Sequence, residues 1–219
     1  MPIGGSSRVL ASVARYYTNK IDTHGPTPWG VDWPCALTQD LRFVQLLKVC
    51  GRRRSFSLND LGCGYGALLS FIGRRYGTGK IDYAGVDISP SMISHALQLW
   101  GDRPSSQFSV SSELPRIAQF SVASGLFNVR LESAARTWTI FIEDVLGELH
   151  RASRLGFAVN FILPAPAGTK ARPGLYRTLP EPWVAYCRKA FRADVAVVEN
   201  YGLREFTLLV RSRPAPKPR

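Results

Sequence analysis

The sequence predicts an α/β fold, a doubly wound and mostly parallel sheet of seven strands with an antiparallel C-terminal hairpin and a short N-terminal helical extension. First, short apolar runs with strand character alternate with amphipathic helical patterns along the 219 residues. Second, residues 156–163 form a nearly continuous apolar run, which is typical of a buried central strand. Third, only a short glycine-containing turn separates the candidate strands 194–199 and 205–211, which indicates a hairpin.

The expected elements follow one another in a regular order. After a helix over roughly 38–49, strands are predicted at 56–60, 80–87, 107–110, 120–124, 156–163, 194–199 and 205–211. Helices are predicted between them at 66–76, from Ser89 onward, at 138–152 and at 183–191. The start at Ser89 is the clearest, because Ser89 suits the cap position and Pro90 suits the first turn.

The chain length suits one α/β domain with a full core. We expect an N-terminal helical and loop extension over 1–52, the main domain over 53–212 and a basic, disordered tail over 213–219. The tail holds three closely spaced prolines, which prevent a regular element.

Charge and cysteine content limit the partners. The formal net charge is +12 and the isoelectric point is about 10.0, so nucleic acid is a possible partner. It is not favoured, because the arginines are scattered and their clusters at 52–54 and 74–75 lack interleaved aromatic residues. The four cysteines form no CxxC pair, so neither a zinc site nor a disulfide framework is indicated, and no metal is predicted.

Neither a membrane span nor a secretory leader is indicated. No apolar run is long enough to cross a bilayer, and the first 20 residues contain no apolar stretch of the length found in a signal core. We therefore expect a cytoplasmic protein without a membrane partner.

A glycine loop follows the first predicted strand. Gly62, Gly64 and Gly66 occupy alternate positions directly after Asp60, and a helical pattern begins behind them. Glycines at this spacing let a strand turn sharply into a helix and let a ligand approach bare backbone. The loop also satisfies a dinucleotide fingerprint, but the carboxylate of Asp60 would repel a pyrophosphate and suits a ligand with a cationic amino-acid portion.

With these residues the chain resembles the class I S-adenosylmethionine-dependent methyltransferases, whose first motif is (D/E)xGxGxG. The segments DLGCGYGALL, GVDISPSMI, ASGLFNVRLE and YGLREFTLLV extend the resemblance to a small bacterial group without an assigned acceptor. The C-terminal hairpin agrees with this family and is not general among dinucleotide dehydrogenases. The resemblance implies S-adenosylmethionine as methyl donor and S-adenosylhomocysteine as product.

The resemblance also implies a donor site at the ends of the first four strands. Asp60 and the glycine loop would hold the methionine part, Asp87 the ribose and Ile88 the adenine. Asp87 lies roughly 20 residues beyond the loop, as expected for an acid that binds a ribose, although a helix-capping role is the alternative. The donor-binding residues predicted in this way are Asp60, Gly62, Cys63, Gly64, Gly66, Asp87, Ile88, Ser112 and Ser124. Ser112 stands where many relatives have an acid.

The acceptor side is less determined. In such folds the N-terminal extension often packs over the pocket, so we expect Trp29, Asp32 and Trp33 to line it, the alternative being that the tryptophans are core residues. Phe127 and Asn128 lie at the fourth strand end and could orient an acceptor. His24 is the best candidate for a general base.

We expect transfer of the methyl group to an O or N atom of a small molecule, sugar or biosynthetic intermediate. Gly125-Leu126 replaces the two prolines of the (D/N/S)PP(Y/F/W) motif, which counts against methylation of nucleobase amino groups in DNA. The alternatives are an RNA methyltransferase and a non-catalytic subunit that binds S-adenosylmethionine. A dehydrogenase is the weakest alternative because of Asp60.

Overall fold

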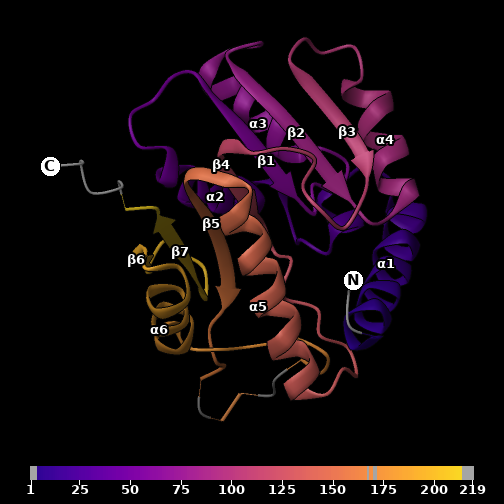
Figure 1. Cartoon of the computed structure of the whole chain (residues 1–219). Helices are drawn as coiled ribbons and strands as arrows, with labels where there is room; N and C mark the ends of the chain where they lie inside the picture. Colours follow the sequence, from indigo (N-terminus) through magenta and orange to yellow (C-terminus); the bar gives the residue numbers. More distant parts are fainter. Residues whose placement is uncertain (1–3, 167, 170–171, 214–219) are drawn as a thin grey trace, which may run out of the picture.

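The computed structural model describes residues 4–166, 168–169 and 172–213, so all of the predicted tail except Arg213 lies outside the described residues. At its centre is a seven-stranded sheet in the order β3-β2-β1-β4-β5-β7-β6 (Figure 1). The strands are β1 (Phe56–Leu61), β2 (Ile81–Asp87), β3 (Ser106–Val110), β4 (Ala118–Ala123), β5 (Ser153–Ile162), β6 (Asp194–Val198) and β7 (Glu205–Arg211).

Strand direction follows the predicted pattern. Neighbouring strands from β3 through to β5 pair in parallel, whereas β7 pairs antiparallel with both β5 and β6. This confirms the predicted mostly parallel sheet with a C-terminal hairpin. The chain order reverses between β1 and β4, and such a switch point is where open parallel sheets bind their ligands.

Helices cover both faces of the sheet. They are α1 (Gly4–His24), α2 (Ala36–Leu46), α3 (Ala67–Tyr76), α4 (Pro90–Trp100), α5 (Ala135–Arg151) and α6 (Pro180–Phe191), with 3-10 turns η1 (Pro28–Val31) and η2 (Leu47–Cys50). Apolar side chains of α2, η2 and α3 pack on one face, and those of α5 and α6 pack on the other. Ser89 accepts a hydrogen bond from the Met92 amide at 3.3 Å and precedes Pro90, so the predicted helix start is confirmed.

Two β-strands begin earlier than predicted. β5 starts at Ser153 and β4 starts at Ala118, and these two residues pair with each other in the sheet. Ser153 is buried, and its hydroxyl donates to the Leu149 carbonyl at 2.6 Å, so a polar residue is satisfied inside the core. Apolar patterning alone does not reveal such a position.

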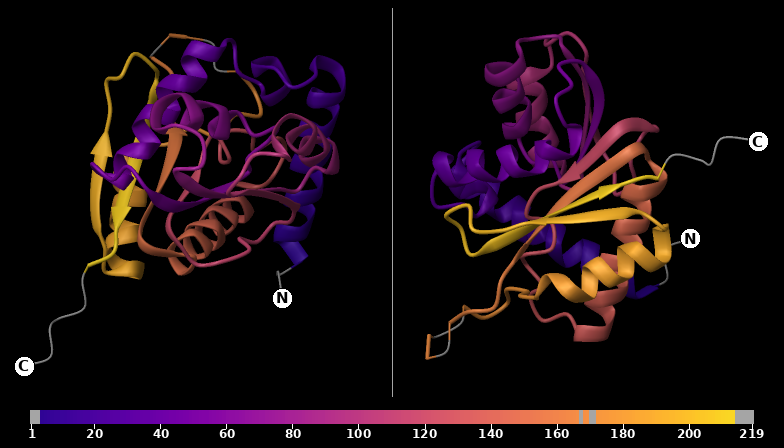
Figure 2. Two further views of the ribbon diagram at one scale, coloured as in Figure 1. Left: turned by 90° about the horizontal axis from the view of Figure 1, so that it is seen from above. Right: turned by 90° about the vertical axis from the view of Figure 1, so that its left-hand side faces the viewer.

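Helix α1 forms most of the N-terminal extension. It lies against α4 and α5 on the outside of the molecule (Figures 1 and 2). Val9 and Val13 are buried in the core cluster shared with α5, and the hydroxyl oxygens of Thr18 and Ser89 are 2.7 Å apart. These contacts place α1 beside the carboxyl ends of β1 and β2.

Within the described part of the chain, no helix combines the length and the apolar character that crossing a membrane requires. The cysteines are all free thiols. Cys50, Cys63 and Cys187 are buried, whereas Cys35 is exposed at the N-cap of α2.

Candidate functional site

A cavity lies at the carboxyl ends of β1, β2 and β4, beside the switch point of the sheet. The glycine loop forms its floor, and side chains of α1 and α5 close it on other sides. Its lining includes Leu10, Val13, Tyr17, Val31, Trp33, Asp60, Gly62, Cys63, Gly64, Asp87, Ile88, Met92, Ser111, Ser112, Ser124, Gly125 and Leu126. We call this the first cavity.

The loop from Gly62 to Gly66 has the left-handed backbone that its glycines permit. Gly62, Gly64 and Gly66 have φ angles of 74°, 55° and 81°. The amides of Gly62 and Cys63 both donate to the Val86 carbonyl, at 2.8 and 3.0 Å, which fixes the loop against β2. The loop is therefore rigidly held at the position where a ligand would meet its backbone.

Gly66, predicted as a donor-binding residue, has a packing role in the loop. It is absent from the cavity lining, and a Cβ atom there would lie 2.6 Å from Cδ1 of Trp100. The Trp100 indole N–H in turn donates to the Tyr65 carbonyl at 2.9 Å. Gly66 is thus required for the close packing of α4 on the loop and for the start of α3.

Asp60 is a buried carboxylate at the end of β1. Its side chain is 2% exposed, and its Oδ2 accepts a hydrogen bond from the Tyr83 hydroxyl at 2.7 Å. Burial raises the pKa of Asp60 to about 7, an effect that the Tyr83 bond opposes and the nearby Asp87 carboxylate increases. A cation beside Asp60 would stabilise its charged form.

Asp87, at the end of β2, is held by two backbone amides. Gly64 N–H donates to Oδ2 at 3.0 Å and Ser89 N–H donates to Oδ1 at 2.9 Å. Burial raises the pKa of Asp87, and these amide bonds oppose the shift. Each carboxylate oxygen keeps a second acceptor position, so stabilising the start of α4 and binding a pair of hydroxyls are compatible.

The remaining predicted donor residues lie around the same cavity. Ile88, Cys63 and the exposed Ser112 line it, as does Ser124. The Oγ atom of Ser124 is buried and has no hydrogen-bond partner among the described residues. A buried hydroxyl without a partner at a cavity wall suits a polar ligand group.

A second cavity adjoins the first. It is lined by Tyr17, Val31, Asp32, Trp33, Pro34, Arg42, Asn128, Val129, Ile162, Arg172, Leu175, Leu203, Arg204 and Glu205. Tyr17, Val31 and Trp33 line both cavities, so they form the wall between them. Three of the residues predicted on the acceptor side, Asp32, Trp33 and Asn128, therefore lie around this second cavity.

Asp32 is tied to α1 and to the loop before α6. Its Oδ2 accepts from the Tyr16 hydroxyl at 2.8 Å, and its Oδ1 lies 3.0 Å from the Lys20 ammonium. The Arg172 guanidinium lies 3.5 Å from Oδ2. Burial, with the Asp32 contact next, raises the pKa of Tyr16 to about 12, so this phenol stays protonated as the donor.

The other acceptor-side predictions are not placed at either cavity. His24 was expected in a loop but is the last residue of α1, where its side chain is exposed. Trp29 lies on η1 and is 57% exposed. Phe127 is 1% exposed, with its ring stacked on Phe161 at 4.9 Å, so it belongs to the core. Helix α1 continues further than the loop-like residues around His24 indicate.

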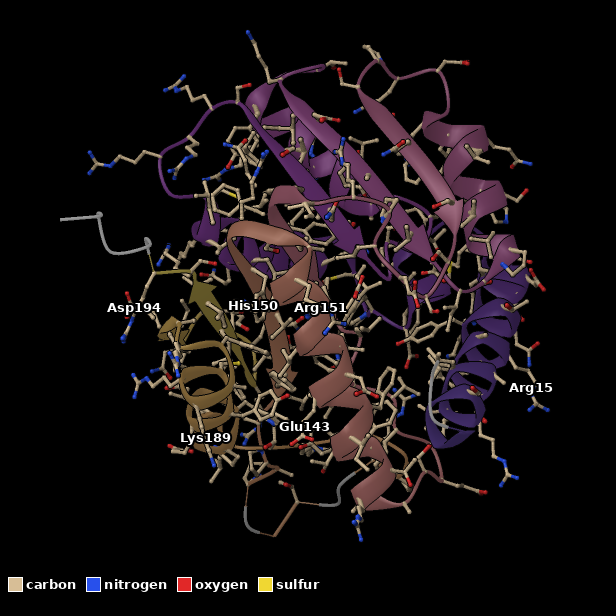
Figure 3. All side chains as sticks on the ribbon, viewed as in Figure 1. Arg15, Glu143, His150, Arg151, Lys189 and Asp194 are labelled. Carbon is tan, nitrogen blue, oxygen red and sulfur yellow. The ribbon has the colours of Figure 1, made fainter. Side chains whose placement is uncertain are left out.

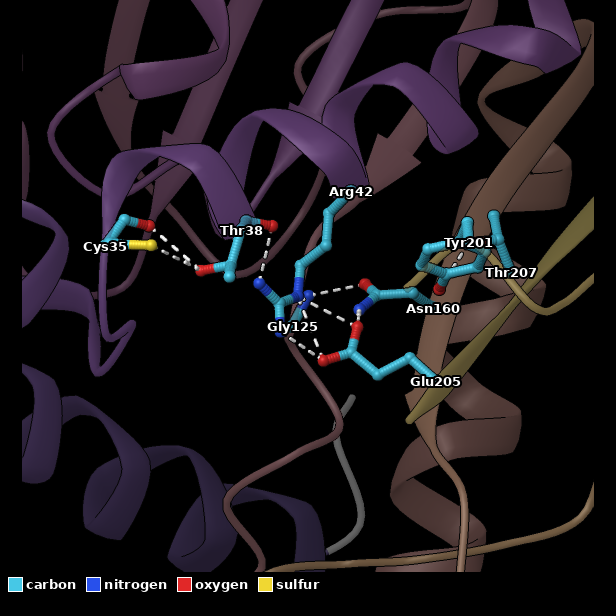
Figure 4. Close-up of polar contacts among 8 residues, drawn as sticks. All are labelled: Cys35, Thr38, Arg42, Gly125, Asn160, Tyr201, Glu205 and Thr207. Carbon is cyan, nitrogen blue, oxygen red and sulfur yellow. Dashed lines mark hydrogen bonds and ion pairs between the residues drawn. The ribbon is translucent and has the colours of Figure 1, made fainter. Parts of the chain in front are cut away.

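A buried polar network supports the wall between the cavities (Figure 4). The Arg42 guanidinium of α2 binds both carboxylate oxygens of Glu205 on β7, with Nε at 2.8 Å from Oε2. Asn160 Nδ2 donates to Glu205 at 2.7 Å, and Asn160 Oδ1 accepts from the Gly125 amide at 2.7 Å. The network thus joins three sequence-distant elements to the backbone at the end of β4.

The same network positions Trp33. The Arg42 guanidinium lies 3.7 Å from the Trp33 ring centre, and that ring packs directly on Gly125, where a Cβ would collide with it. Arg42, Glu205 and Tyr17 line the second cavity although no motif in the sequence singles them out. Their partners are far away in the chain, and Arg42 and Glu205 are 163 positions apart, so no local pattern could reveal them.

The chain resembles a known protein over most of its length. It is 40% identical over 165 residues to the Mycobacterium tuberculosis (strain ATCC 25618 / H37Rv) protein Rv1506c, which is provisionally named a methyltransferase. The matched region covers 75% of this chain and 98% of that protein. No protein-family model matches the chain.

Solved structures with the same fold include three methyltransferases. Magnesium protoporphyrin IX methyltransferase from Synechocystis PCC 6803 superposes with a TM-score of 0.65 at 13% identity, covering 93% of this chain and 99% of that one. N-methyltransferase NodS from Bradyrhizobium japonicum WM9 gives 0.64 at 11% identity, covering 92% and 98%. Human N-acetylserotonin methyltransferase gives 0.63 at 17% identity, covering 94% and 59%.

Three findings agree: the fold, the glycine loop that follows Asp60 at the switch point of the sheet, and the 40% identity to Rv1506c. The chain belongs to the class I, S-adenosylmethionine-dependent methyltransferases.

Proposed function

We propose that the protein transfers a methyl group from S-adenosylmethionine, held in the first cavity, to an O or N atom of a small molecule in the second cavity. The observation that carries this proposal is that two adjoining cavities share the wall formed by Tyr17, Val31 and Trp33. Similar structures were crystallised with S-adenosylmethionine or S-adenosylhomocysteine, which supports the choice of donor.

The residues of the first cavity fit the donor. Asp60 would bind its ammonium group, because a buried carboxylate gains most from a nearby cation. Asp87 would accept hydrogen bonds from the ribose hydroxyls, and Ile88 would pack on the adenine with Ser112 at its edge. The Ser124 hydroxyl, which has no hydrogen-bond partner among the described residues, would bind a polar part of the ligand.

The protein would accelerate methyl transfer mainly by positioning the donor and the acceptor. Bound donor supplies a sulfonium methyl group, whose carbon–sulfur bond breaks as the new bond to the acceptor forms. Holding the acceptor in line with the methyl group is therefore the main task of the protein. Trp33 and the Gly125 backbone, which the buried network fixes, are the groups that would set this alignment.

The acceptor must also lose a proton if it is an alcohol or a protonated amine. His24 lies outside both cavities, so it is poorly placed to remove that proton. An amine that binds in its neutral form needs no base before transfer and releases its proton to solvent afterwards. This favours such an amine as the first acceptor class to test.

The spread of basic residues supports a small acceptor rather than RNA. Arg15, Arg151 and Lys189 lie on three different helices, α1, α5 and α6, and all three are exposed (Figure 3). A nucleic-acid surface would concentrate such charges on one face.

The decisive experiment is the transfer of labelled methyl from S-adenosylmethionine into a size-fractionated cell extract, with and without RNase. We expect label in the low-mass fraction, unaffected by RNase. Label in large, RNase-sensitive material would identify an RNA methyltransferase instead. Tight binding of S-adenosylhomocysteine without any transfer would identify a non-catalytic binding subunit.

A further inference from the structure

The second cavity carries a surplus of positive charge. Among its described lining residues are three arginines, Arg42, Arg172 and Arg204, and two acids, Asp32 and Glu205. Both acids already have cationic partners: Glu205 binds Arg42, and Asp32 lies 3.0 Å from Lys20. Asp32 also lies 3.5 Å from Arg172, so it is shared between two cations, and among the described residues no acid pairs with Arg204. The positive charges around the second cavity therefore outnumber the negative ones.

Arg172 and Arg204 are only loosely held by the protein. The Arg204 guanidinium donates one hydrogen bond, to the Pro164 carbonyl at 2.8 Å. Arg172 approaches Asp32 no closer than 3.5 Å, and its side chain is 59% exposed. A guanidinium has five N–H donors in a planar fork, so both side chains keep donors that match the oxygens of a carboxylate or phosphate.

Asn128 gives an independent indication of a polar ligand in the same cavity. The residue is 5% exposed, it lines the second cavity, and its Oδ1 has no hydrogen-bond partner within the part of the chain that the structure describes. Leaving a buried acceptor unsatisfied is costly, so a ligand that donates an O–H or N–H here would gain affinity.

The second cavity has room for a small ligand. Its volume is about 220 Å³, and its lining includes the paired Arg42 and Glu205. Glu205 also accepts a hydrogen bond from Asn160, so this part of the wall is held by several polar contacts.

We propose that the acceptor is a small anionic molecule, whose carboxylate or phosphate binds Arg172 and Arg204 and whose hydroxyl or amine group donates to Asn128. This inference rests on the proposed function, since it places the acceptor beside the methyl donor. The anionic group serves as an anchor, and the methyl group goes to a different atom of the same molecule.

The first test uses the labelled product of the transfer experiment. We expect it to be retained on a strong anion-exchange column at about pH 11, where an amine is largely neutral and a carboxylate or phosphate keeps its charge; loss of retention after alkaline phosphatase would indicate a phosphate, and unchanged retention a carboxylate. The double variant Arg172→Gln/Arg204→Gln should lower transfer at least about tenfold, because two charge-assisted hydrogen-bonding groups are lost. The matched variant Arg213→Gln, an exposed arginine paired with Asp194 on β6, should transfer normally.

Outcomes separate this inference from the proposed function. A labelled product that passes through the column, or full transfer by the double variant, would overturn the anionic acceptor and leave methyl transfer intact. S-adenosylhomocysteine affinity, measured by calorimetry, should be the same in wild type and double variant, which shows that the first cavity is unchanged.

A direct binding measurement covers the case in which the extract contains no acceptor. Inorganic phosphate and acetate are titrated into the protein saturated with S-adenosylhomocysteine. Binding is followed by the NMR chemical shifts of labelled arginine side chains. We expect at least one anion to shift resonances that are missing in the double variant. Equal shifts in wild type and double variant, or none at all, would contradict an anion site.

Discussion

Asp60 and Asp87 are neighbouring carboxylates whose surroundings differ. Asp60 accepts one hydrogen bond from a side chain, that of Tyr83, whereas Asp87 accepts two from the backbone. Burial is the largest cause of the raised pKa of each, and the pKa of Asp60 is raised to about 7, which is close to neutral pH. Donor binding should therefore depend on pH through Asp60.

The affinity for S-adenosylhomocysteine should rise between pH 6 and pH 8, by up to about tenfold, because its ammonium group binds the ionised form of Asp60. In the protein without ligand, a rise in pH has the opposite effect, because it lowers the stability of the fold. Folded Asp60 keeps a proton between its ordinary pKa of 3.8 and about 7, so its contribution to the free energy of unfolding falls as pH rises through that range.

Calorimetric titrations at several pH values measure this dependence. The variant Asp60→Asn should bind more weakly at pH 8 and show a flat profile. An affinity of the wild type that is equal at pH 6 and pH 8 would show that Asp60 does not contact the ammonium group.

Replacing Asp87 should weaken donor binding because hydrogen bonds are lost. Asp87→Ala removes the acceptor for two backbone amides and for the proposed ribose hydroxyls, so we expect a loss of about 1.5–3 kcal/mol in S-adenosylhomocysteine binding. Asp194→Ala, an exposed acid on β6, is the control and should bind as wild type. Undiminished affinity in Asp87→Ala would exclude the ribose role.

At the scale of elements, α2 is joined to the sheet by a buried ion pair. Arg42 and Glu205 have side chains that are each 6% exposed, and the pair connects α2 to the first residue of β7. Removing one partner of such a pair leaves a buried charge without compensation.

Arg42→Ala should therefore lower the free energy of unfolding by about 3–5 kcal/mol, measured by urea denaturation. The control is Arg74→Ala: Arg74 pairs with Asp40 of the same helix α2, but on the surface, and should cost about 1 kcal/mol or less. Similar losses in the two variants would mean that burial adds nothing to the Arg42–Glu205 pair.

The elements were largely predictable, and the links between them were not. The order of strands and helices follows from apolar periodicity, and the position of Asp60 and the glycines follows from a single strand–loop–helix pattern. Arg42, Glu205 and Tyr17 act through contacts across the fold. Their residue types are common in helices and at strand ends, so only the folded chain shows that they adjoin the cavities.

At the scale of the whole molecule, the cavity wall is assembled from distant parts of the chain. The first cavity takes residues from α1, β1, β2, α5 and the loop after β4. A ligand in this cavity therefore contacts several elements at once and should stabilise the entire fold.

S-adenosylhomocysteine at about 100 times its dissociation constant should add about 2.7 kcal/mol to the free energy of unfolding. For a chain of this length that corresponds to a rise in Tm of roughly 5–11 °C, measured by differential scanning calorimetry. NAD at the same concentration should leave Tm unchanged. A rise with NAD and none with S-adenosylhomocysteine would reverse the assignment of the donor.

The exposed thiol of Cys35 has a practical consequence. Hydrogen bonds, the largest from the Thr38 amide at the start of α2, lower the pKa of this thiol, while burial raises the pKa of Cys50, Cys63 and Cys187. A maleimide dye should therefore attach to Cys35 first. Cys35 lies two residues from Trp33, which is part of the wall between the two cavities. A fluorophore attached to Cys35 should therefore report whether a ligand occupies them.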